Sequence, residues 1–182
     1  MKLGALTCAL ALTLGGGVAM VGVAGADQDS DTAQLKQVRS SMARYHSPAQ
    51  AERAGYELAS PCEVSPVGDG GMGFHYVKAA LIEDPAIDPL RPEILLYAPK
   101  ENGRVELVGV EYLTFDEDGM LGTDGDRPSL NGVAFDGPMP GHGPEPMPGH
   151  EPQMPVHYDL HVWLYEDNPR GLFAPWNPNV TC

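Results

Sequence analysis

Basic residues are scarce in this sequence of 182 residues. It has 11 lysines and arginines against 25 aspartates and glutamates, which gives a formal net charge of −14. A chain this acidic repels the phosphates of nucleic acids and of anionic lipids. We therefore expect neither nucleic acid nor an anionic membrane surface as a partner.

Cysteine is also rare. The chain has three cysteines, and one of them, Cys8, lies in the N-terminal segment considered below. The other two, Cys62 and Cys182, form an even pair that an oxidising compartment would join in a disulfide. Closing so long a loop would contribute about 4–5 kcal/mol in the chain-entropy account. Two free thiols, or a thiolate metal ligand, are the alternatives.

Several familiar catalytic signatures are missing. No glycine-rich phosphate loop precedes a predicted helix, and no Gly-x-Ser-x-Gly elbow supplies a serine nucleophile. Neither a Cys-x-x-Cys nor a His-Glu-x-x-His pattern occurs. The sequence names no reaction, so whether the protein is an enzyme stays open.

The first residues have the form of a secretory signal peptide, in a style that looks bacterial. Lys2 supplies a positive charge, residues 3–23 are apolar or small, and an Ala-Gly-Ala sequence at 24–26 suits cleavage. An uncleaved membrane anchor is the alternative, but a glycine triplet within the apolar run favours cleavage. We predict a signal peptide at 1–26 and one secreted domain at 27–182. The domain would have no transmembrane segment and would lie outside the cell or on the exterior of its envelope.

Two helices are predicted near the start of this domain. Apolar residues at spacings of three and four indicate a helix over residues 32–45. Ser47 and Pro48 suit the cap and the first position of a second helix, which Gly55 would end.

Four later segments favour β-strands, because they are rich in β-branched and aromatic residues: 72–77, 92–97, 104–113 and 156–165. An Asn-Gly pair between the second and third predicts that these two form an antiparallel hairpin. The expected fold class is α+β. Two short N-terminal helices would pack on an antiparallel β-sheet or small open barrel of about four to six strands.

The segment 138–155 is rich in proline, methionine and histidine, and contains an eight-residue repeat. Its prolines predict an extended surface loop. It also gathers thioether and imidazole groups, which are ligands that copper selects. The residues concerned are Met139, His142, Met147, His150 and Met154. A copper-handling protein is therefore one hypothesis, and a duplicated loop without a function is the alternative.

The last predicted strand alternates between an apolar and a polar side. His157, Asp159 and His161 share the polar side, because successive side chains of a strand point to opposite faces. His75 lies in the first predicted strand. Glu111 lies in the third, where its parity is that of the apolar residues Val105, Leu107 and Leu113. A carboxylate on an apolar face is costly to bury unless it is paired or bound to a metal.

If these strands are neighbours, their imidazoles and carboxylate would converge. We predict a divalent-metal site with His75, Glu111, His157 and His161 as ligands, and with Asp159 orienting an imidazole. Zinc, copper, iron and manganese all suit such ligands. The alternative is a metal-free binding or structural module of the cell envelope, in which the histidines are structural.

Three sequence blocks resemble a group of exported bacterial proteins of unknown function. The blocks are Gly-Met-Gly-Phe-His-Tyr-Val at 71–77, Val-Gly-Val-Glu-Tyr at 108–112 and His-Tyr-Asp-Leu-His-Val-Trp at 157–163, with a closing Asn-Pro-Asn-Val-Thr-Cys. The resemblance covers most of the secreted domain and implies export. Histidines and a glutamate on strands are also similar to the ligands of cupins. In cupins, however, two close histidines and the glutamate come first, whereas here the close pair comes last.

Overall fold

The computed structural model describes residues 24–140 and 154–182, with side chains from residue 32 onward. Residues 1–23 of the predicted signal peptide and the middle of the repeat lie outside the described residues. Within the described part of the chain, no helix is long and apolar enough to cross a membrane.

Helices begin the fold, as expected. Helix α1 (Ala24–Met42) continues into a 3-10 turn, η1 (Ala43–Tyr45), and α2 (Pro48–Arg53) follows. The first helix thus begins eight residues before the predicted start at residue 32. At α2, the backbone N–H of Ser47 donates to Oε1 of Gln50 at 3.2 Å, as part of a capping box. A third, short helix, α3 (Ala79–Ile82), lies between two strands.

Seven strands form one open antiparallel sheet in the order β1-β3-β4-β5-β9-β8, with β2 paired to β3 beside β1. The expected α+β class is therefore confirmed. The four predicted strands are its centre, and the additional strands lie at its edges. The strands of the sheet are β1 (Glu57–Leu58), β2 (Glu63–Val64), β3 (Gly71–Val77), β4 (Ile94–Pro99), β5 (Val105–Phe115), β8 (Asp136–Met139) and β9 (His157–Trp163). Two further strands, β6 (Ser129–Leu130) and β7 (Val133–Ala134), pair only with each other.

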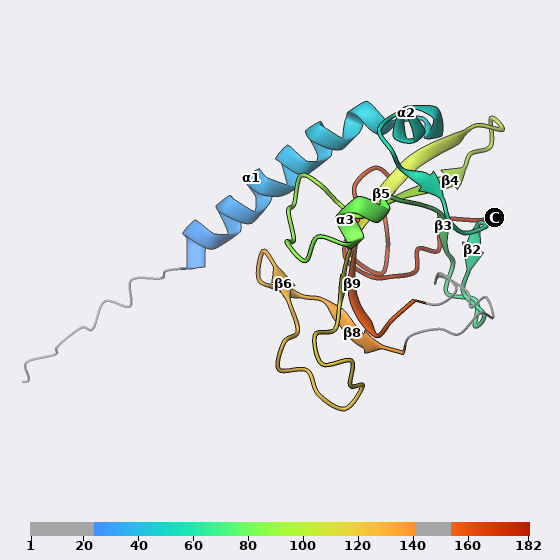
Figure 1. The fold of residues 1–182 in the computed structure, drawn as a ribbon. Helices are drawn as coiled ribbons and strands as arrows, with labels where there is room; N and C mark the ends of the chain where they lie inside the picture. Colours follow the sequence, from blue (N-terminus) through green and yellow to red (C-terminus); the bar gives the residue numbers. More distant parts are fainter. Residues whose placement is uncertain (1–23, 141–153) are drawn as a thin grey trace, which may run out of the picture.

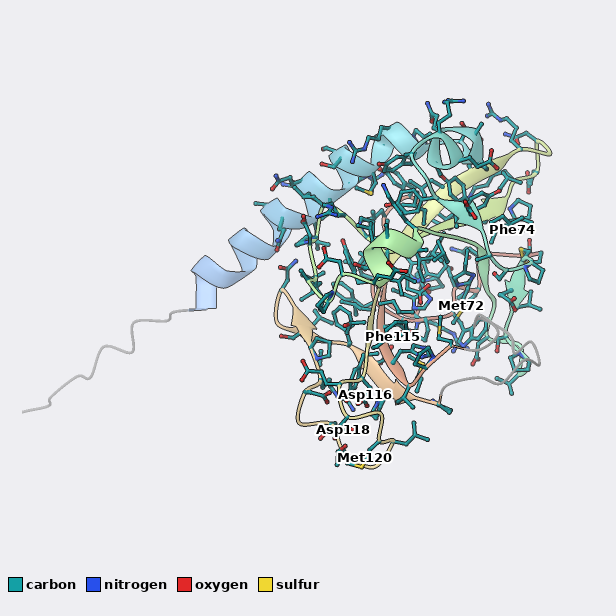
Figure 2. All side chains as sticks on the ribbon, in the orientation of Figure 1. Met72, Phe74, Phe115, Asp116, Asp118 and Met120 are labelled. Carbon is teal, nitrogen blue, oxygen red and sulfur yellow. A yellow bond between two sulfur atoms is a disulfide. The ribbon has the colours of Figure 1, made fainter. Side chains whose placement is uncertain are left out.

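One face of the sheet is covered by α1, η1 and α2, and we call it the helix-covered face (Figure 1). Its buried cluster includes Val38 and Met42 from the helix and Leu95, Val110 and Leu160 from the sheet. Apolar side chains with spacings of three and four in α1 meet this cluster, which explains why the helix packs there. Side chains fill the interior of the domain, whereas Met120 lies at the outer end of the loop that follows β5 (Figure 2).

The opposite face has its own buried cluster, and we call it the site face. Strands β4, β5 and β9 contribute Leu96, Leu113 and Trp163. Met154 and Val180, which precede and follow β9 in the chain, complete the cluster. The sheet is thus buried on both sides, which agrees with the continuous apolar run in β4.

Strand β5 contains a β-bulge at Val108. Leu96 of β4 pairs with Gly109, but the next residue, Tyr97, pairs with Leu107. Val108 is therefore an extra residue in β5, and a bulge of this kind changes which face the following side chains occupy.

The bulge corrects the predicted surroundings of Glu111. Leu107 and Val110 both pack in the helix-covered cluster, although they are three residues apart. Leu113 packs instead on the site face. Glu111 has the parity of Leu113, so its placement on one face with Val105 and Leu107 was wrong. The sequence pattern assumed a regular strand, and the bulge reverses the alternation.

Cys62 and Cys182 form the predicted disulfide, with Cα atoms 5.7 Å apart. The last part of the chain is also fixed to β3, because Gly71 and Asn177 exchange two backbone hydrogen bonds of 3.0 Å. A Cβ at Gly71 would lie 2.9 Å from Val180, so this close contact requires glycine. The disulfide rules out both cysteines as thiolate metal ligands.

Candidate metal centre

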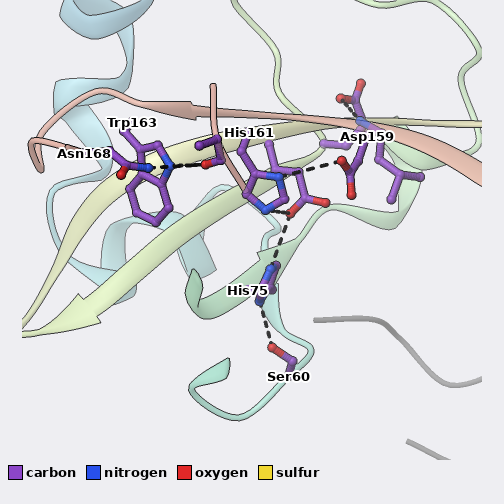
Figure 3. A network of polar contacts seen from close by, with 10 residues as sticks. Ser60, His75, Asp159, His161, Trp163 and Asn168 are labelled. Carbon is purple, nitrogen blue, oxygen red and sulfur yellow. Dashed lines mark hydrogen bonds and ion pairs between the residues drawn. The ribbon is translucent and has the colours of Figure 1, made fainter. Parts of the chain in front are cut away.

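Three ionisable side chains from three strands meet on the site face (Figure 3). Glu111 of β5 lies directly opposite His161 of β9 in the ladder. His75 comes from β3, on the other side of β4. We call these three residues the triad. Sequence reasoning predicted all three as metal ligands, and the structure brings them together.

The atoms of the triad are spaced for a metal ion. Nε2 of His75 lies 3.4 Å from Oε2 of Glu111, and Nε2 of His161 lies 3.7 Å from the same oxygen. One potential ligand atom from each residue lies within 4.8 Å of the other two. An ion with tetrahedral bonds of about 2.0–2.1 Å spaces its ligands about 3.4 Å apart. The triad could therefore hold a metal after small movements.

Direct hydrogen bonding explains these distances less well. A charge-assisted N–H···O hydrogen bond usually closes to about 2.7–2.9 Å, which is shorter than either contact with Glu111. All three side chains are at least 95% buried. Among the described residues, Oε2 of Glu111 and Nε2 of His161 have no hydrogen-bond partner. Buried polar atoms in this state are rare in folded proteins and commonly mark a function or a bound ion.

Burial and neighbouring charges shift the protonation of the triad. Burial raises the pKa of Glu111 to about 8, although His161 acts in the opposite direction. Burial alone would lower the pKa of His161, but Glu111 and Asp159 outweigh it and raise this pKa to about 9. Glu111 and His161 thus titrate as one coupled pair, and a metal ion that binds both would have to displace any proton they share.

Asp159 lies on the other side of His161. Its Oδ1 is 3.7 Å from Nδ1 of His161, and its residue surface is 5% exposed. A carboxylate behind a ligating imidazole commonly orients the ring and increases its basicity. This position agrees with the role that the sequence suggested for Asp159.

Ser60 is a polar neighbour of the triad that sequence reasoning missed. Its Oγ lies 2.9 Å from Nδ1 of His75, and its hydroxyl donates to the carbonyl of Pro61 at 2.9 Å. With its hydrogen directed to Pro61, Oγ of Ser60 has a lone pair to accept from Nδ1. In the tautomer that uses this acceptor, the lone pair of Nε2 faces Glu111, as metal binding requires. The one sequence signal that could have identified Ser60 is its position two residues before Cys62, a cysteine predicted to form a disulfide.

His157 lies outside the triad. It pairs with Phe115 of β5 and Met139 of β8, and its Nδ1 is 2.8 Å from the carbonyl oxygen of Pro155. Four residues of strand separate it from His161, a distance of roughly 13 Å. The structure thus places three of the four predicted ligands together and the fourth further along β9.

The predicted soft-metal loop is described only at its ends. Met139 lies in β8 and is partly exposed, whereas Met154 is 8% exposed and packs in the site-face cluster. His142, Met147 and His150 lie outside the described residues.

No protein-family model matches this chain, and no curated protein or solved structure was found to match it. The resemblance to exported bacterial proteins therefore stays a prediction. The chemistry of the site follows from its own residues: two imidazoles and a carboxylate, buried together on one face of an antiparallel sheet.

Proposed function

We propose that this chain is an exported protein that binds one divalent transition-metal ion through His75, Glu111 and His161. The observation that carries this proposal is the convergence of three buried ligand atoms within 4.8 Å of one another. Two imidazole nitrogens and one carboxylate oxygen suit zinc, copper, iron or manganese. Asp159 and Ser60 orient the two imidazoles from behind.

The ligand count suggests what such an ion does. Three protein ligands leave at least one coordination position for water or a small ligand, as in catalytic metal sites. The apolar side chains of the site-face cluster surround the triad and lower the local dielectric, which strengthens the action of the ion on a bound group. A Lewis-acid or redox role would use this open position.

Export is supported by two features. The N-terminal sequence has the pattern of a signal peptide, and the Cys62–Cys182 disulfide is of a kind that persists in oxidising compartments. A location outside the cytoplasm also places the protein where it meets metal ions from the surroundings.

The test is elemental analysis of the mature protein, purified from its own exported fraction without a histidine tag. We expect about one equivalent of a single transition metal. Glu111→Gln, His75→Ala and His161→Ala should each abolish it, because each removes a ligand of the triad. Circular dichroism would confirm that each variant is folded.

His157→Ala is the matched control, since it removes a buried histidine of the same strand that lies outside the triad. It should keep its metal. Full metal content in the triad variants, or no metal bound or taken up by the unchanged protein, would contradict the proposal and favour a metal-free structural module. Loss of copper on deletion of residues 141–153, with the triad intact, would favour the copper-handling alternative.

A further inference from the structure

The Cys62–Cys182 disulfide joins two parts of the chain that are held to the sheet in different ways. One part is residues 57–64, which contain β1, Ser60 and β2, and we call it the disulfide-bonded segment. The other part is residues 172–182, which we call the C-terminal tail. The end of this tail lies beside β2 and β3 (Figure 1). The disulfide thus attaches the tail to the segment that carries Ser60.

The C-terminal tail is anchored by burial and by hydrogen bonds. Asn177 is fully buried, and its backbone exchanges two hydrogen bonds with Gly71 of β3. Its side-chain amide donates to the carbonyl oxygen of Asp167 at 3.2 Å. Val180 is 2% exposed and packs in the site-face cluster with Trp163. Contacts other than the disulfide therefore fix the tail against the site face.

The disulfide-bonded segment has little apolar anchorage of its own. Its two large apolar side chains, Leu58 and Val64, are 54% and 49% exposed. Strands β1 and β2 contain two residues each, and between them Ala59 donates its backbone N–H to the carbonyl oxygen of His75 at 2.9 Å. A segment with few buried apolar contacts opens locally at low cost. The covalent bond to the anchored tail therefore does much to keep this segment in place.

Ser60 connects the disulfide-bonded segment to the triad. It lies two residues before Cys62, and its Oγ is 2.9 Å from Nδ1 of His75. The other imidazole is supported differently, because Asp159 lies behind His161 on the same central strand. Release of the segment would therefore take the acceptor away from His75 and leave the support of His161 unchanged.

We propose that oxidation of Cys62 and Cys182 completes the metal site, because the disulfide fixes Ser60 behind His75. This inference rests on the proposed metal-binding function and adds its regulation. The oxidant is a disulfide donor. The sulfur–sulfur bond between Cys62 and Cys182 forms, the bond of the donor breaks, and two electrons and two protons pass to the donor, which leaves as two thiols. Cys182 is exposed and Cys62 partly exposed, so a donor reaches them at the surface.

The proposal gives an order of events for an exported protein. In a reducing cytoplasm both cysteines stay as thiols, and the chain binds its metal weakly. In an oxidising compartment the disulfide forms, Ser60 is fixed, and the affinity for the metal rises. The protein then loads its metal after export.

Co²⁺ titration of the mature protein tests this dependence. The unchanged, oxidised protein is compared with the double variant Cys62→Ala/Cys182→Ala. Alanine is used because free thiols could themselves bind Co²⁺. The double variant keeps all three ligands of the triad, and its dissociation constant should be about 10- to 100-fold weaker, as for loss of a partner behind a ligating histidine.

Combination with Ser60→Ala identifies the route. Ser60→Ala with the disulfide intact should weaken Co²⁺ binding by a similar factor. Addition of Ser60→Ala to the double cysteine variant should change the dissociation constant by no more than about threefold further, because both changes remove the same contact with His75. A disulfide that only stabilised the fold would not give this non-additive result.

Leu160→Ala is the control for general stability. It removes a buried side chain from the helix-covered face and should leave the Co²⁺ affinity of the folded protein unchanged. Circular dichroism confirms that each variant is folded. If the double cysteine variant does not fold, insertion of two glycines between Val180 and Thr181 replaces it. The insertion keeps the disulfide but slackens it, and should weaken Co²⁺ binding in the same direction.

Three results would overturn the inference. Equal Co²⁺ affinity with and without the disulfide, or with the slackened one, would show that the site is complete in its absence. Additive losses for Ser60→Ala and the cysteine variant would show that the disulfide does not act through Ser60. In both cases Co²⁺ binding by the unchanged protein would leave the proposed function standing. Failure of the unchanged, oxidised protein to bind Co²⁺ would overturn the function and its regulation together.

Discussion

The two faces of the sheet bury polar groups in different ways. On the helix-covered face, several buried tyrosines donate their hydroxyls to backbone carbonyls. The hydroxyl of Tyr56 donates to the carbonyl oxygen of Pro92 at 2.8 Å, and that of Tyr112 donates to the carbonyl oxygen of Pro89 at 2.7 Å. On the site face, the triad is ionisable, and Oε2 of Glu111, at 3.4 and 3.7 Å from the two imidazoles, has no hydrogen-bond partner among the described residues.

This difference separates groups that stabilise the fold from groups that serve another purpose. A buried hydroxyl with a partner adds about 0.5–1.5 kcal/mol to stability. Buried ionisable groups without a full set of partners cost free energy, and replacing such a group of charges as a whole with well-packed apolar side chains is often neutral or stabilising. The site face therefore keeps a costly arrangement, because several of its buried ionisable atoms have no hydrogen-bond partner among the described residues. Metal binding gives this arrangement a reason.

The largest expected effect concerns packing on the helix-covered face. Leu160 is 2% exposed and belongs to that cluster, so Leu160→Ala should reduce the free energy of unfolding by about 2–5 kcal/mol. The metal content of this variant per folded molecule should not change, because the side chain of Leu160 packs on the face opposite the triad. Urea denaturation and Co²⁺ titration measure the two quantities.

Leu113→Ala provides the contrast on the site face. Leu113 is 3% exposed, so a similar loss of stability is expected, but Leu113 packs on the face of Glu111 and its loss should also weaken metal binding. Equal metal affinity in both variants would mean that the two faces do not divide stability from binding in this way.

The sequence located the centre of the sheet well, because β3, β4, β5 and β9 are long enough to show a pattern of their own. The two-residue strands β1 and β2 have none. They exist because β3 offers them backbone partners, which is a tertiary effect. The start of α1 was placed too late because the polar residues before Thr32 carry no apolar stripe.

Residue types pointed to the candidate metal ligands, but only the folded structure shows which of them lie together. A histidine or glutamate on an apolar strand is unusual enough to notice in a sequence. Which of them meet depends on strand order and register, which are set by pairing across the sheet. His157 has the same parity as His161 and still lies elsewhere along β9, whereas Ser60 reaches His75 from an irregular segment held by a disulfide.

A second prediction concerns Glu93, the buried acid close to the tyrosines of the helix-covered face. It is 1% exposed, and its Oε2 accepts a hydrogen bond from the backbone N–H of Leu113 at 3.2 Å. Burial raises its pKa to about 7, from an ordinary value of 4.5. The folded state therefore holds the proton more tightly than the unfolded state, and stability falls as pH rises from about 4.5 to about 7.

Glu93→Gln removes this ionisation. The variant should gain stability over the unchanged protein as pH rises through that window, by an amount on the order of 3 kcal/mol at pH 8. Urea denaturation at several pH values, compared between the two proteins, isolates this residue from other titrating groups. A constant difference between pH 4.5 and 8 would show that Glu93 is already ionised in the folded protein, as an exposed acid would be.

The smallest expected effect concerns Ser60, which connects the triad to the disulfide-bonded segment. Ser60→Ala removes the acceptor for Nδ1 of His75 and leaves all three ligands in place. Loss of such a partner behind a ligating histidine weakens metal affinity by about 10- to 100-fold. Co²⁺ titration measures the loss.

Ser65→Ala is a matched control, because Ser65 is also buried but its hydroxyl oxygen accepts a hydrogen bond from the backbone N–H of Val67. If both variants bind Co²⁺ as tightly as the unchanged protein, then β3 alone orients His75. If both lose affinity equally, the effect is one of general stability. A loss of Co²⁺ affinity confined to Ser60→Ala would show that Ser60, behind a ligand of the site face, serves metal binding and not general stability.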